Sequence, residues 1–334
     1  MKAIAGATGI LGSRIARELL SRGEQIRVLV RSDEAQKTWE ALGAEVVYGD
    51  LSDPASLDAL CSGADVVVTT ATASARGGNS EVERTDVEGN QNLIDAAKRA
   101  DVKRFVFVSI SLADSVSPVP LLRAKGITEK SLQSSGLAWT IVAPHFYMES
   151  WIDMMVGIPV RGQLPVWIHG DGRRLHSFVS LSDVAAIAVA AVLNESAANR
   201  RLLIGGYPVS WREIVDACQE LIDDPIEMRV LPPRSGVPHV SEPFGTTLGM
   251  ISELLDAGDV IIESTPIYEE FGVTETPLRS FLITMLADRR RPFRDQPAIA
   301  PQTAADRGAE PTPTPQFIDP SDSAHDEKQG DNHG

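Results

Sequence analysis

Residues 1–14, which read MKAIAGATGILGSR, decide the fold of this chain. A short apolar run enters a turn that carries Gly6, Gly9 and Gly12, and an amphipathic segment follows at once. This order predicts a strand, a tight turn and a helix, the arrangement that binds a dinucleotide pyrophosphate. Gly6 would permit the sharp turn, Gly9 would let the backbone approach the pyrophosphate, and Gly12 would let the helix pack close to the strand. The N–H groups that begin the helix would then face the phosphates.

Three glycines alone are also compatible with an ordinary connection between a strand and a helix, so the flanking chain matters. A second apolar run at 26–30 ends at Arg31, and a third at 44–48 is followed by Gly49 and Asp50. This repeat predicts a right-handed βαβ unit and favours the dinucleotide-binding interpretation. The residues of the turn expected to contact the dinucleotide are Gly6, Ala7, Thr8, Gly9, Ile10, Leu11 and Gly12.

The alternation of strands and helices continues and predicts an α/β fold with a doubly wound parallel sheet, a Rossmann fold. Further strands are expected at 64–70, 104–109, 137–142 and 201–206. We expect one dinucleotide-binding domain over 1–288 with a small C-terminal α/β lobe for the substrate, whose irregular parts are 145–180 and 225–288. From 289 to 334 proline and polar residues dominate, so a disordered tail is expected.

The composition of the chain limits the classes of protein to which it can belong. The chain has 334 residues, 43% of them hydrophobic and 23% charged, which suffices for a full apolar core. The formal net charge of −15 argues against direct nucleic-acid binding, which requires clustered Lys and Arg. No run reaches the roughly 20 apolar residues of a membrane helix, and a first strand that begins at Met1 leaves no room for a leader. We therefore expect a cytoplasmic protein without membrane insertion.

Arg31 stands where a dinucleotide-binding fold meets the adenosine ribose. An acidic residue there binds the free 2′-hydroxyl of NAD, whereas an arginine pairs with a 2′-phosphate. The sequence thus favours NADP(H) over NAD(H). The alternative is a solvated arginine, and repulsion from Asp33 and Glu34 weakens the phosphate interpretation.

Thr70, Ala71 and Thr72 leave the fourth expected strand at its carboxyl end. Open parallel sheets bind ligands at this edge, and small side chains would let the cofactor ribose lie against the backbone. A loop at 74–79 is expected above the site.

The glycine turn resembles the fingerprint of the short-chain dehydrogenase/reductase superfamily, in particular its atypical, NmrA-like branch of NAD(P)H-binding quinone reductases, isoflavone-type reductases and redox-sensing regulators. Further matching stretches are 49–53 (GDLSD), 86–90 (DVEGN), 104–109 (RFVFVS), 135–137 (SGL) to Pro144, and 177–179 (SFV) to 183–185 (DVA). The resemblance covers about residues 1–285 and implies fold and cofactor class rather than substrate.

The resemblance also implies residue roles at the cofactor. The Asp50 side chain and the Leu51 backbone would hold the adenine edge, and the chain at Pro144 would fold over the nicotinamide. The alternative for Asp50 is that it and Ser52 only cap the next helix.

Standard members of the superfamily use Ser, Tyr and Lys, with the tyrosine as acid or base. Here Ser109 and Lys125 match by position, but Leu121 stands four residues before Lys125, where the tyrosine is expected. The resemblance implies that Lys125 binds the cofactor ribose and can donate a proton, and that Ser109 orients the substrate oxygen. The alternative for Lys125 is a solvated side chain beside Glu129.

A replacement acid could come from Tyr147 or His145, which follow Pro144. Tyr147 could protonate a reduced carbonyl or quinone oxygen, or it could pack in the core, which is the favoured interpretation. His145 is expected to be a loop histidine whose hydrogen bonds are satisfied. No cluster of histidine, cysteine and acidic residues has the spacing of metal ligands, so no metal is expected.

The sequence therefore predicts an NADP(H)-dependent oxidoreductase of the NmrA-like type that reduces a small-molecule quinone, enone or related carbonyl by hydride transfer. The missing tyrosine keeps a second interpretation open, a catalytically silent NADPH-binding sensor or assembly factor with a protein partner. A sugar-nucleotide epimerase needs the Tyr-x-x-x-Lys pair and is disfavoured.

Overall fold

The computed structural model describes residues 1–73, 79–242 and 244–287. The chain divides into two units, Met1–Ile299 and Ala300–Gly334, and every described residue belongs to the first. The loop expected at 74–79, apart from its last residue, and the tail expected at 289–334 lie outside the described residues.

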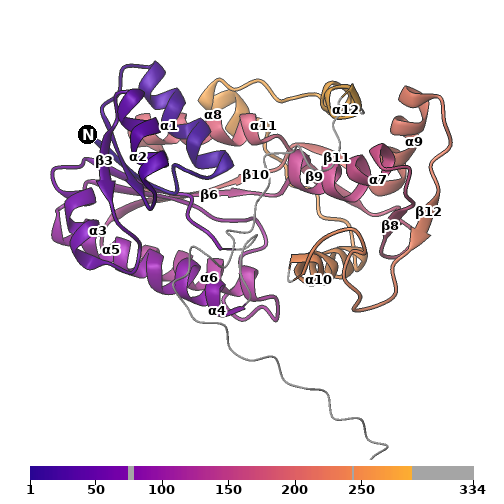
Figure 1. Ribbon diagram of the computed structural model, residues 1–334, viewed down its shortest axis with the longest axis horizontal. Coiled ribbons are helices and arrows are strands. Elements are labelled where there is room, and N and C mark those ends of the chain that lie inside the picture. The colour runs from indigo at the N-terminus through magenta and orange to yellow at the C-terminus, as the bar shows by residue number, and fades with distance from the viewer. Residues whose placement is uncertain (74–78, 243, 288–334) are drawn as a thin grey trace, which may run out of the picture. The chain divides into compact units, whose positions relative to one another are not determined.

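A parallel sheet of seven strands forms the centre of this unit (Figure 1). In chain order the strands are β1 (Lys2–Ala5), β2 (Ile26–Val30), β3 (Glu45–Tyr48), β4 (Val66–Thr69), β5 (Arg104–Val108), β6 (Ala138–Pro144) and β10 (Arg200–Ile204). Across the sheet they lie in the order β10-β6-β5-β4-β1-β2-β3, and all neighbours are parallel. The order reverses between β1 and β4, which confirms the doubly wound fold. Such sheets bind ligands at the carboxyl ends of the strands beside this reversal.

Helices cover both faces of the sheet (Figure 1). One face carries α1 (Ile10–Ser21), α2 (Asp33–Ala41), α8 (Leu181–Leu193) with the short η3 (Glu195–Ala197), and α11 (Thr265–Phe271); the other carries α3 (Pro54–Cys61), α5 (Asn90–Arg99) and α6 (Pro120–Gln133). Because strand side chains alternate between faces, Ile4 joins the first apolar cluster while Ala3 and Ala5 join the second. The central strand is thus apolar on both sides, as a buried parallel strand requires.

The helical segment between β4 and β5 is divided. A short α4 (Asn79–Val82) leads into the π-helical η1 (Glu83–Gly89), and α5 begins only at Asn90. Insertions of π-helix often occur at functional sites. Here the π-helical turn contains Asp86, whose side chain is completely buried.

A third apolar cluster forms the smaller lobe. Its elements are β7 (Phe146–Tyr147), η2 (Met148–Gly157), α7 (Ile158–Arg161), β8 (Val166–Ile168), β9 (Leu175–Val179), β11 (Tyr207–Ser210), α9 (Trp211–Ile222), β12 (Met228–Val230), α10 (Phe244–Asp256) and α12 (Leu278–Ala287). The stretch 145–180 is more regular than expected, because Val160, Val166 and Ile168 pack into this cluster and order the chain around them.

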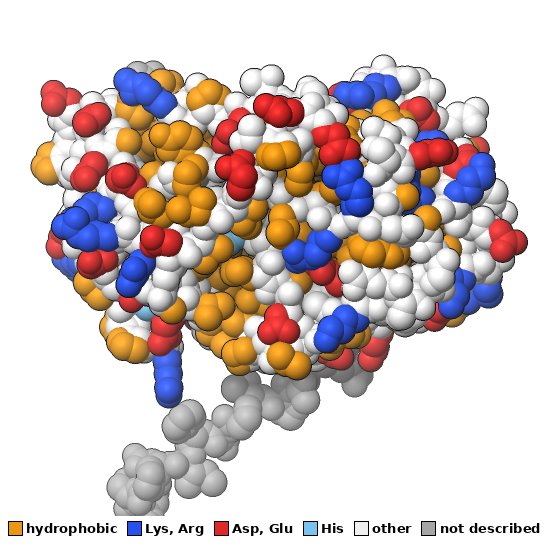
Figure 2. Space-filling view, turned by 180° about the vertical axis from the view of Figure 1, so that it is seen from behind, with side chains coloured by type: hydrophobic (Ala, Val, Ile, Leu, Met, Phe, Trp, Pro, Cys, Tyr) orange, Lys and Arg blue, Asp and Glu red, His pale blue; other side chains and the backbone are white. Residues whose placement is uncertain are grey.

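The surface shows no concentration of one charge on the face drawn in Figure 2, where the described Lys, Arg, Asp and Glu side chains are interspersed around a central apolar area. None of the described helices is long and apolar enough to cross a lipid bilayer. The expected cytoplasmic location stays a prediction.

Candidate functional site

The turn between β1 and α1 depends on glycine at two positions. Gly6 has a φ of 90°, in the left-handed region, and a Cβ there would lie 2.6 Å from Thr70 Oγ1. At Gly12 a Cβ would overlap the carbonyl oxygen of Gly6. Both glycines therefore allow α1 to start close against the sheet, as the sequence predicts.

Gly9 is different, because among the described residues a Cβ there would meet only the Gly6 carbonyl oxygen, at 3.3 Å. Gly9 is the N-cap of α1, and no described side chain caps this helix. The first N–H groups of α1 are therefore left for a ligand. Ala7 is buried and can offer only its backbone, whereas Thr8 and Ile10 are exposed beside the turn. This cradle fits a dinucleotide pyrophosphate.

The carboxyl end of β4 lies against the same turn. The Thr70 hydroxyl donates a hydrogen bond to the Gly6 carbonyl oxygen at 3.2 Å, and Ala71 and Thr72 follow half-buried. Leu51 is buried near the end of β3, and its carbonyl accepts a hydrogen bond from a side-chain amide of α5 at 3.1 Å. The turn and the strand exits therefore form one continuous edge.

Arg31 and Asp50 lie together where β2 and β3 end. Arg31 Nη1 is 3.5 Å from Asp50 Oδ2, and both side chains are about half exposed. Burial tends to raise the pKa of Asp50, but hydrogen bonds from Ser52 and the charge of Arg31 outweigh it and hold the pKa below its usual value. The alternative in which Asp50 caps the next helix is wrong, because the N-cap of α3 is Asp53.

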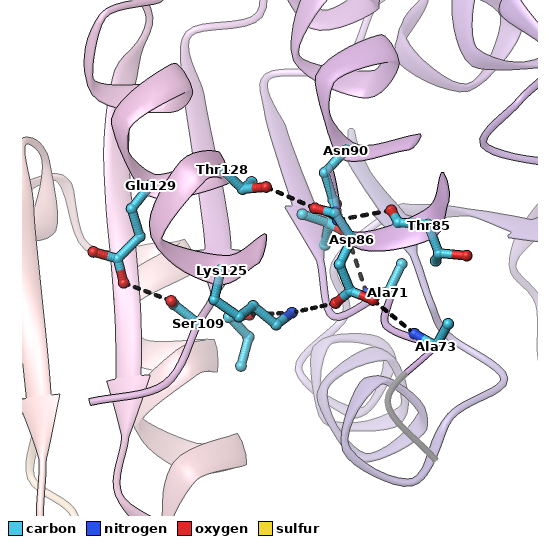
Figure 3. A network of polar contacts seen from close by, with 11 residues as sticks. Ala71, Ala73, Thr85, Asp86, Asn90, Ser109, Lys125, Thr128 and Glu129 are labelled. Carbon is cyan, nitrogen blue, oxygen red and sulfur yellow. Dashed lines mark hydrogen bonds and ion pairs between the residues drawn. The ribbon is translucent and has the colours of Figure 1, made fainter. Parts of the chain in front are cut away.

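Lys125 is buried in an ion pair (Figure 3). Its Nζ lies 3.2 Å from Asp86 Oδ1 and 3.4 Å from the Val108 carbonyl oxygen. The other carboxylate oxygen of Asp86 accepts a hydrogen bond from Ala73 N at 2.9 Å. The alternative in which Lys125 is solvated beside Glu129 is wrong. Asp86 is a site residue that sequence reasoning missed, although it opens one of the stretches that carry the resemblance.

The backbone around Asp86 is fixed as well (Figure 3). The Thr128 hydroxyl donates to the Asp86 carbonyl oxygen at 2.6 Å, and so does the Asn90 amide at 3.2 Å. Asn90 also accepts a hydrogen bond from the Thr69 hydroxyl at 2.9 Å. The π-helical turn is thus tied to α6 and to β4, so that Asp86 holds Lys125 at the carboxyl edge of the sheet.

Ser109 is occupied by a neighbouring carboxylate (Figure 3). Its hydroxyl donates to Glu129 Oε1 at 2.5 Å, and both residues are buried. Arg201 holds the same carboxylate through Nε at 2.8 Å and Nη2 at 3.1 Å. A hydroxyl has one proton to donate. In this structure Ser109 is therefore not free to donate to a substrate oxygen.

Ser111, two residues further, meets His145 after the end of β6. Ser111 Oγ lies 2.6 Å from His145 Nδ1. Burial, with a smaller contribution from His176, lowers the pKa of His145 to about 3, so its ring is neutral at physiological pH. Among the described residues His145 Nε2 has no hydrogen-bond partner. The expectation of a fully satisfied loop histidine is therefore wrong for one nitrogen, and Ser111 is the second site residue that sequence reasoning missed.

Tyr147 packs against the apolar cluster on the α1 and α8 face of the sheet. Burial, followed by the charge of Glu149, raises the pKa of its phenol. A phenol with a raised pKa is a poorer proton donor, so the geometry favours the packing interpretation. Pro144, the last residue of β6, is buried, and its carbonyl accepts a hydrogen bond from Ser111 N at 2.8 Å.

Burial gives the protein a specific sensitivity to acid. It lowers the pKa of His145, His169 and His176 below the usual value of 6.5. The folded protein therefore favours the neutral rings. Above pH 6.5 these histidines are neutral in both the folded and the unfolded state, and stability is highest. Below pH 6.5 the unfolded state binds protons that the folded state does not, so stability is lost as the pH falls. We expect the free energy of unfolding to decrease by up to about 1.4 kcal/mol per histidine and pH unit on acidification from neutrality. Urea unfolding at a series of pH values measures this.

The control for this acid sensitivity is His145→Asn, which removes one of the three titrating rings. Its unfolding free energy should depend less steeply on pH than that of the wild type. An unfolding free energy that is constant between neutrality and mild acid would contradict the prediction.

A doubly wound sheet with a glycine turn, an uncapped helix start and a buried lysine at one edge defines a dinucleotide-binding protein. Residues 6–195 match the model of the NAD(P)H-binding family, and the chain belongs to this family. The match confirms the resemblance to atypical, NmrA-like short-chain dehydrogenase/reductases.

Proteins with different named activities are similar to this chain over most of its length. The photosystem II assembly factor Ycf39 of Synechocystis sp. is 29% identical over 291 residues, which cover 84% of this chain and 88% of that protein. An NAD(P)H azoreductase of Xenophilus azovorans is 27% identical over 274 residues, which cover 82% and 90%. An NADPH-dependent quinone oxidoreductase of Escherichia coli, crystallised with NADPH, has the same fold, with a TM-score of 0.72 at 20% identity over 87% and 100% of the chains.

Proposed function

We propose that this protein is an NADPH-dependent oxidoreductase that reduces a quinone, an enone or a related conjugated carbonyl. The observation that carries the proposal is that the glycine turn and the Lys125–Asp86 pair lie at one edge of the sheet. Bound NADPH would supply the hydride. The chain would hold its pyrophosphate with the N–H groups at the start of α1, its 2′-phosphate with Arg31 and its nicotinamide ribose with Lys125. An ammonium group has three donors, so Lys125 keeps one for a ribose hydroxyl besides Asp86 and the Val108 carbonyl.

The polar groups of the site favour this class of acceptor. Ser109 donates to Glu129, the phenol of Tyr147 has a raised pKa, and His145 is neutral. Reduction of a quinone or an enone tolerates a weak acid, because the developing charge is delocalised and water can supply the proton. Oxidation of a secondary alcohol needs a base with a pKa near neutrality, and the position of the missing tyrosine is occupied by Leu121.

An acceptor panel tests the proposal. NADPH oxidation should be measurable with quinones and enones, and secondary alcohols with NADP⁺ should give no reaction. Efficient alcohol oxidation would contradict the proposed site.

The choice of cofactor depends on Arg31. NADPH should bind more tightly than NADH, and Arg31→Ala should narrow the difference in binding free energy by about 1.5–3 kcal/mol, the range for a hydrogen bond to a charged group. Fluorescence titration of the wild type and the variant with NADPH and with NADH measures this difference. Arg99→Ala is the matched control, since Arg99 is an equally exposed arginine that pairs with Asp58 on α3. Wild-type protein that binds NADH as tightly as NADPH would overturn the assignment.

The second candidate is an NADPH-binding sensor or assembly factor without turnover, which acts through a protein partner. It is favoured by the Ycf39 assembly factor among the relatives and by the absence of the tyrosine. Tight NADPH binding without reduction of any acceptor would select this candidate.

A further inference from the structure

Ser111 and His145 form a polar pair at the ligand-binding edge of the sheet. Ser111 follows β5, and His145 follows β6, the adjacent strand. Ser111 N donates to the Pro144 carbonyl oxygen at 2.8 Å, which brings the Ser111 hydroxyl to 2.6 Å from His145 Nδ1. Lys125 reaches the same end of β5, at the Val108 carbonyl oxygen. The pair therefore lies on the same edge of the sheet as Lys125, which the proposed function assigns to the nicotinamide ribose, and an acceptor of the hydride must bind at this edge.

The backbone that carries Ser111 is held in place from the outer strand β10. Arg201 Nη2 donates to the carbonyl oxygens of Ile110 and Ser111, at 3.0 Å and 3.2 Å. The same guanidinium group binds Glu129, which occupies the hydroxyl of Ser109. Of the two serines after β5, Ser111 is thus the one whose backbone is fixed and whose hydroxyl does not donate to a described carboxylate. A donor fixed in this way need not reorganise when charge develops on a ligand.

The hydrogen bonds of His145 indicate which nitrogen carries its proton. The side chain is 1% exposed, and Nε2 has no partner in the described part of the chain. A proton on Nε2 would leave a buried donor unpaired and would turn the Ser111 hydroxyl toward Nδ1. A proton on Nδ1 leaves only a lone pair unpaired at Nε2, and buried unpaired N–H groups are the rarer case in proteins. With the proton on Nδ1, the ring donates to Ser111 Oγ.

We propose that His145 is a positioning residue whose Nδ1–H holds Ser111 Oγ, so that the Ser111 hydroxyl donates a hydrogen bond to the carbonyl oxygen of the acceptor. This inference rests on the proposed function and names the residue that meets the acceptor. The acceptor gains a hydride from NADPH at carbon and a proton from water at oxygen. Ser111 keeps its own proton and stabilises the negative charge that develops on the acceptor oxygen.

Four variants test the pair by its effect on kcat for quinone reduction. Ser111→Ala and His145→Phe should each lower kcat at least about tenfold, toward the roughly 10²–10³-fold cost of losing one oxyanion donor, with NADPH affinity unchanged. The double variant should be no slower than Ser111→Ala, because both residues act through one hydrogen bond. His145→Asn should restore much of the rate, because its amide can take the place of Nδ1–H. Ser134→Ala is the control, since this exposed serine bonds to carbonyls of its own helix, α6.

Nitrogen NMR of labelled histidine supplies a readout that does not depend on turnover. The neutral ring of His145 should carry its proton on Nδ1, and a proton on Nε2 would overturn the inference. Wild-type turnover that persists in Ser111→Ala and His145→Phe would also overturn it while the proposed function stands. No wild-type turnover with any acceptor would overturn the proposed function and with it the role of Ser111 toward an acceptor, and the tautomer would then test only the hydrogen bond from His145 to Ser111.

Discussion

Gly9→Val should abolish NADPH binding and leave the protein folded. Gly9 is the N-cap of α1, and the one contact that a Cβ would make there with the described residues is a tight one with the Gly6 carbonyl oxygen at 3.3 Å, so the turn has to shift by only a few tenths of an ångström to accept a side chain. A valine would instead fill the space through which a pyrophosphate reaches the N–H groups of the helix. Fluorescence titration should show no saturable NADPH binding, while circular dichroism and the thermal unfolding midpoint stay near those of the wild type.

Two glycines give this experiment its controls. At Gly258 a Cβ would have no described atom within 4 Å, so Gly258→Val should leave binding unchanged. Gly12→Ala should instead destabilise the fold, because its Cβ would overlap the Gly6 carbonyl oxygen. Unchanged NADPH affinity in Gly9→Val would contradict the assignment of the turn as the pyrophosphate site.

Lys125→Ala should lower turnover more than it lowers NADPH affinity. Lys125 is held at the carboxyl end of β5 by Asp86, where the proposed function places the nicotinamide ribose. We expect its positive charge to act there, together with the Ser111 hydroxyl, on the charge that develops on the acceptor. We expect kcat with a quinone to fall about tenfold or more beyond the change in Kd, which corresponds to about 1.4 kcal/mol of transition-state stabilisation. Equal losses in kcat and affinity would reduce Lys125 to a binding residue.

The buried partner of Lys125 complicates this variant and calls for a matched pair. Removal of the ammonium leaves Asp86, which is completely buried, without its counter-charge, and such a loss costs about 3–5 kcal/mol of stability. Asp86→Asn in the Lys125→Ala background should recover part of the stability without recovering turnover. The control is Lys130→Ala, since Lys130 is an exposed lysine of the same helix. This variant should leave both the stability and the turnover unchanged.

The sequence predicts well what depends on local pattern. The strand and helix repeat follows from apolar runs and turn residues, and the roles of Gly6 and Gly12 follow from the backbone approach that the fold requires. The division of the helix at Asn90 could not be predicted, because a π-helical turn leaves no separate periodic signal.

Most of the hydrogen bonds and ion pairs at the candidate site could not be predicted from the sequence, because the residues that form them are distant in the chain. Glu129 stands four residues after Lys125, which is the spacing of a surface ion pair on a helix. In the structure, however, Glu129 binds Arg201 and Lys125 binds Asp86. Similarly, nothing in the sequence around Ser109 and Ser111 tells which hydroxyl faces Glu129. That choice is made by the packing of α6 and β10 around the end of β5.

We propose that this chain transfers a hydride from NADPH to a conjugated carbonyl. A single-turnover experiment tests it most directly: protein loaded with stoichiometric NADPH is mixed with a quinone, and the absorbance of the reduced nicotinamide is followed. We expect the absorbance to be lost in step with formation of the hydroquinone and faster than in a mixture without protein. With Gly9→Val the loss should be no faster than in the mixture without protein. If the absorbance of the reduced nicotinamide falls no faster with the protein than without it, the proposed hydride transfer is wrong.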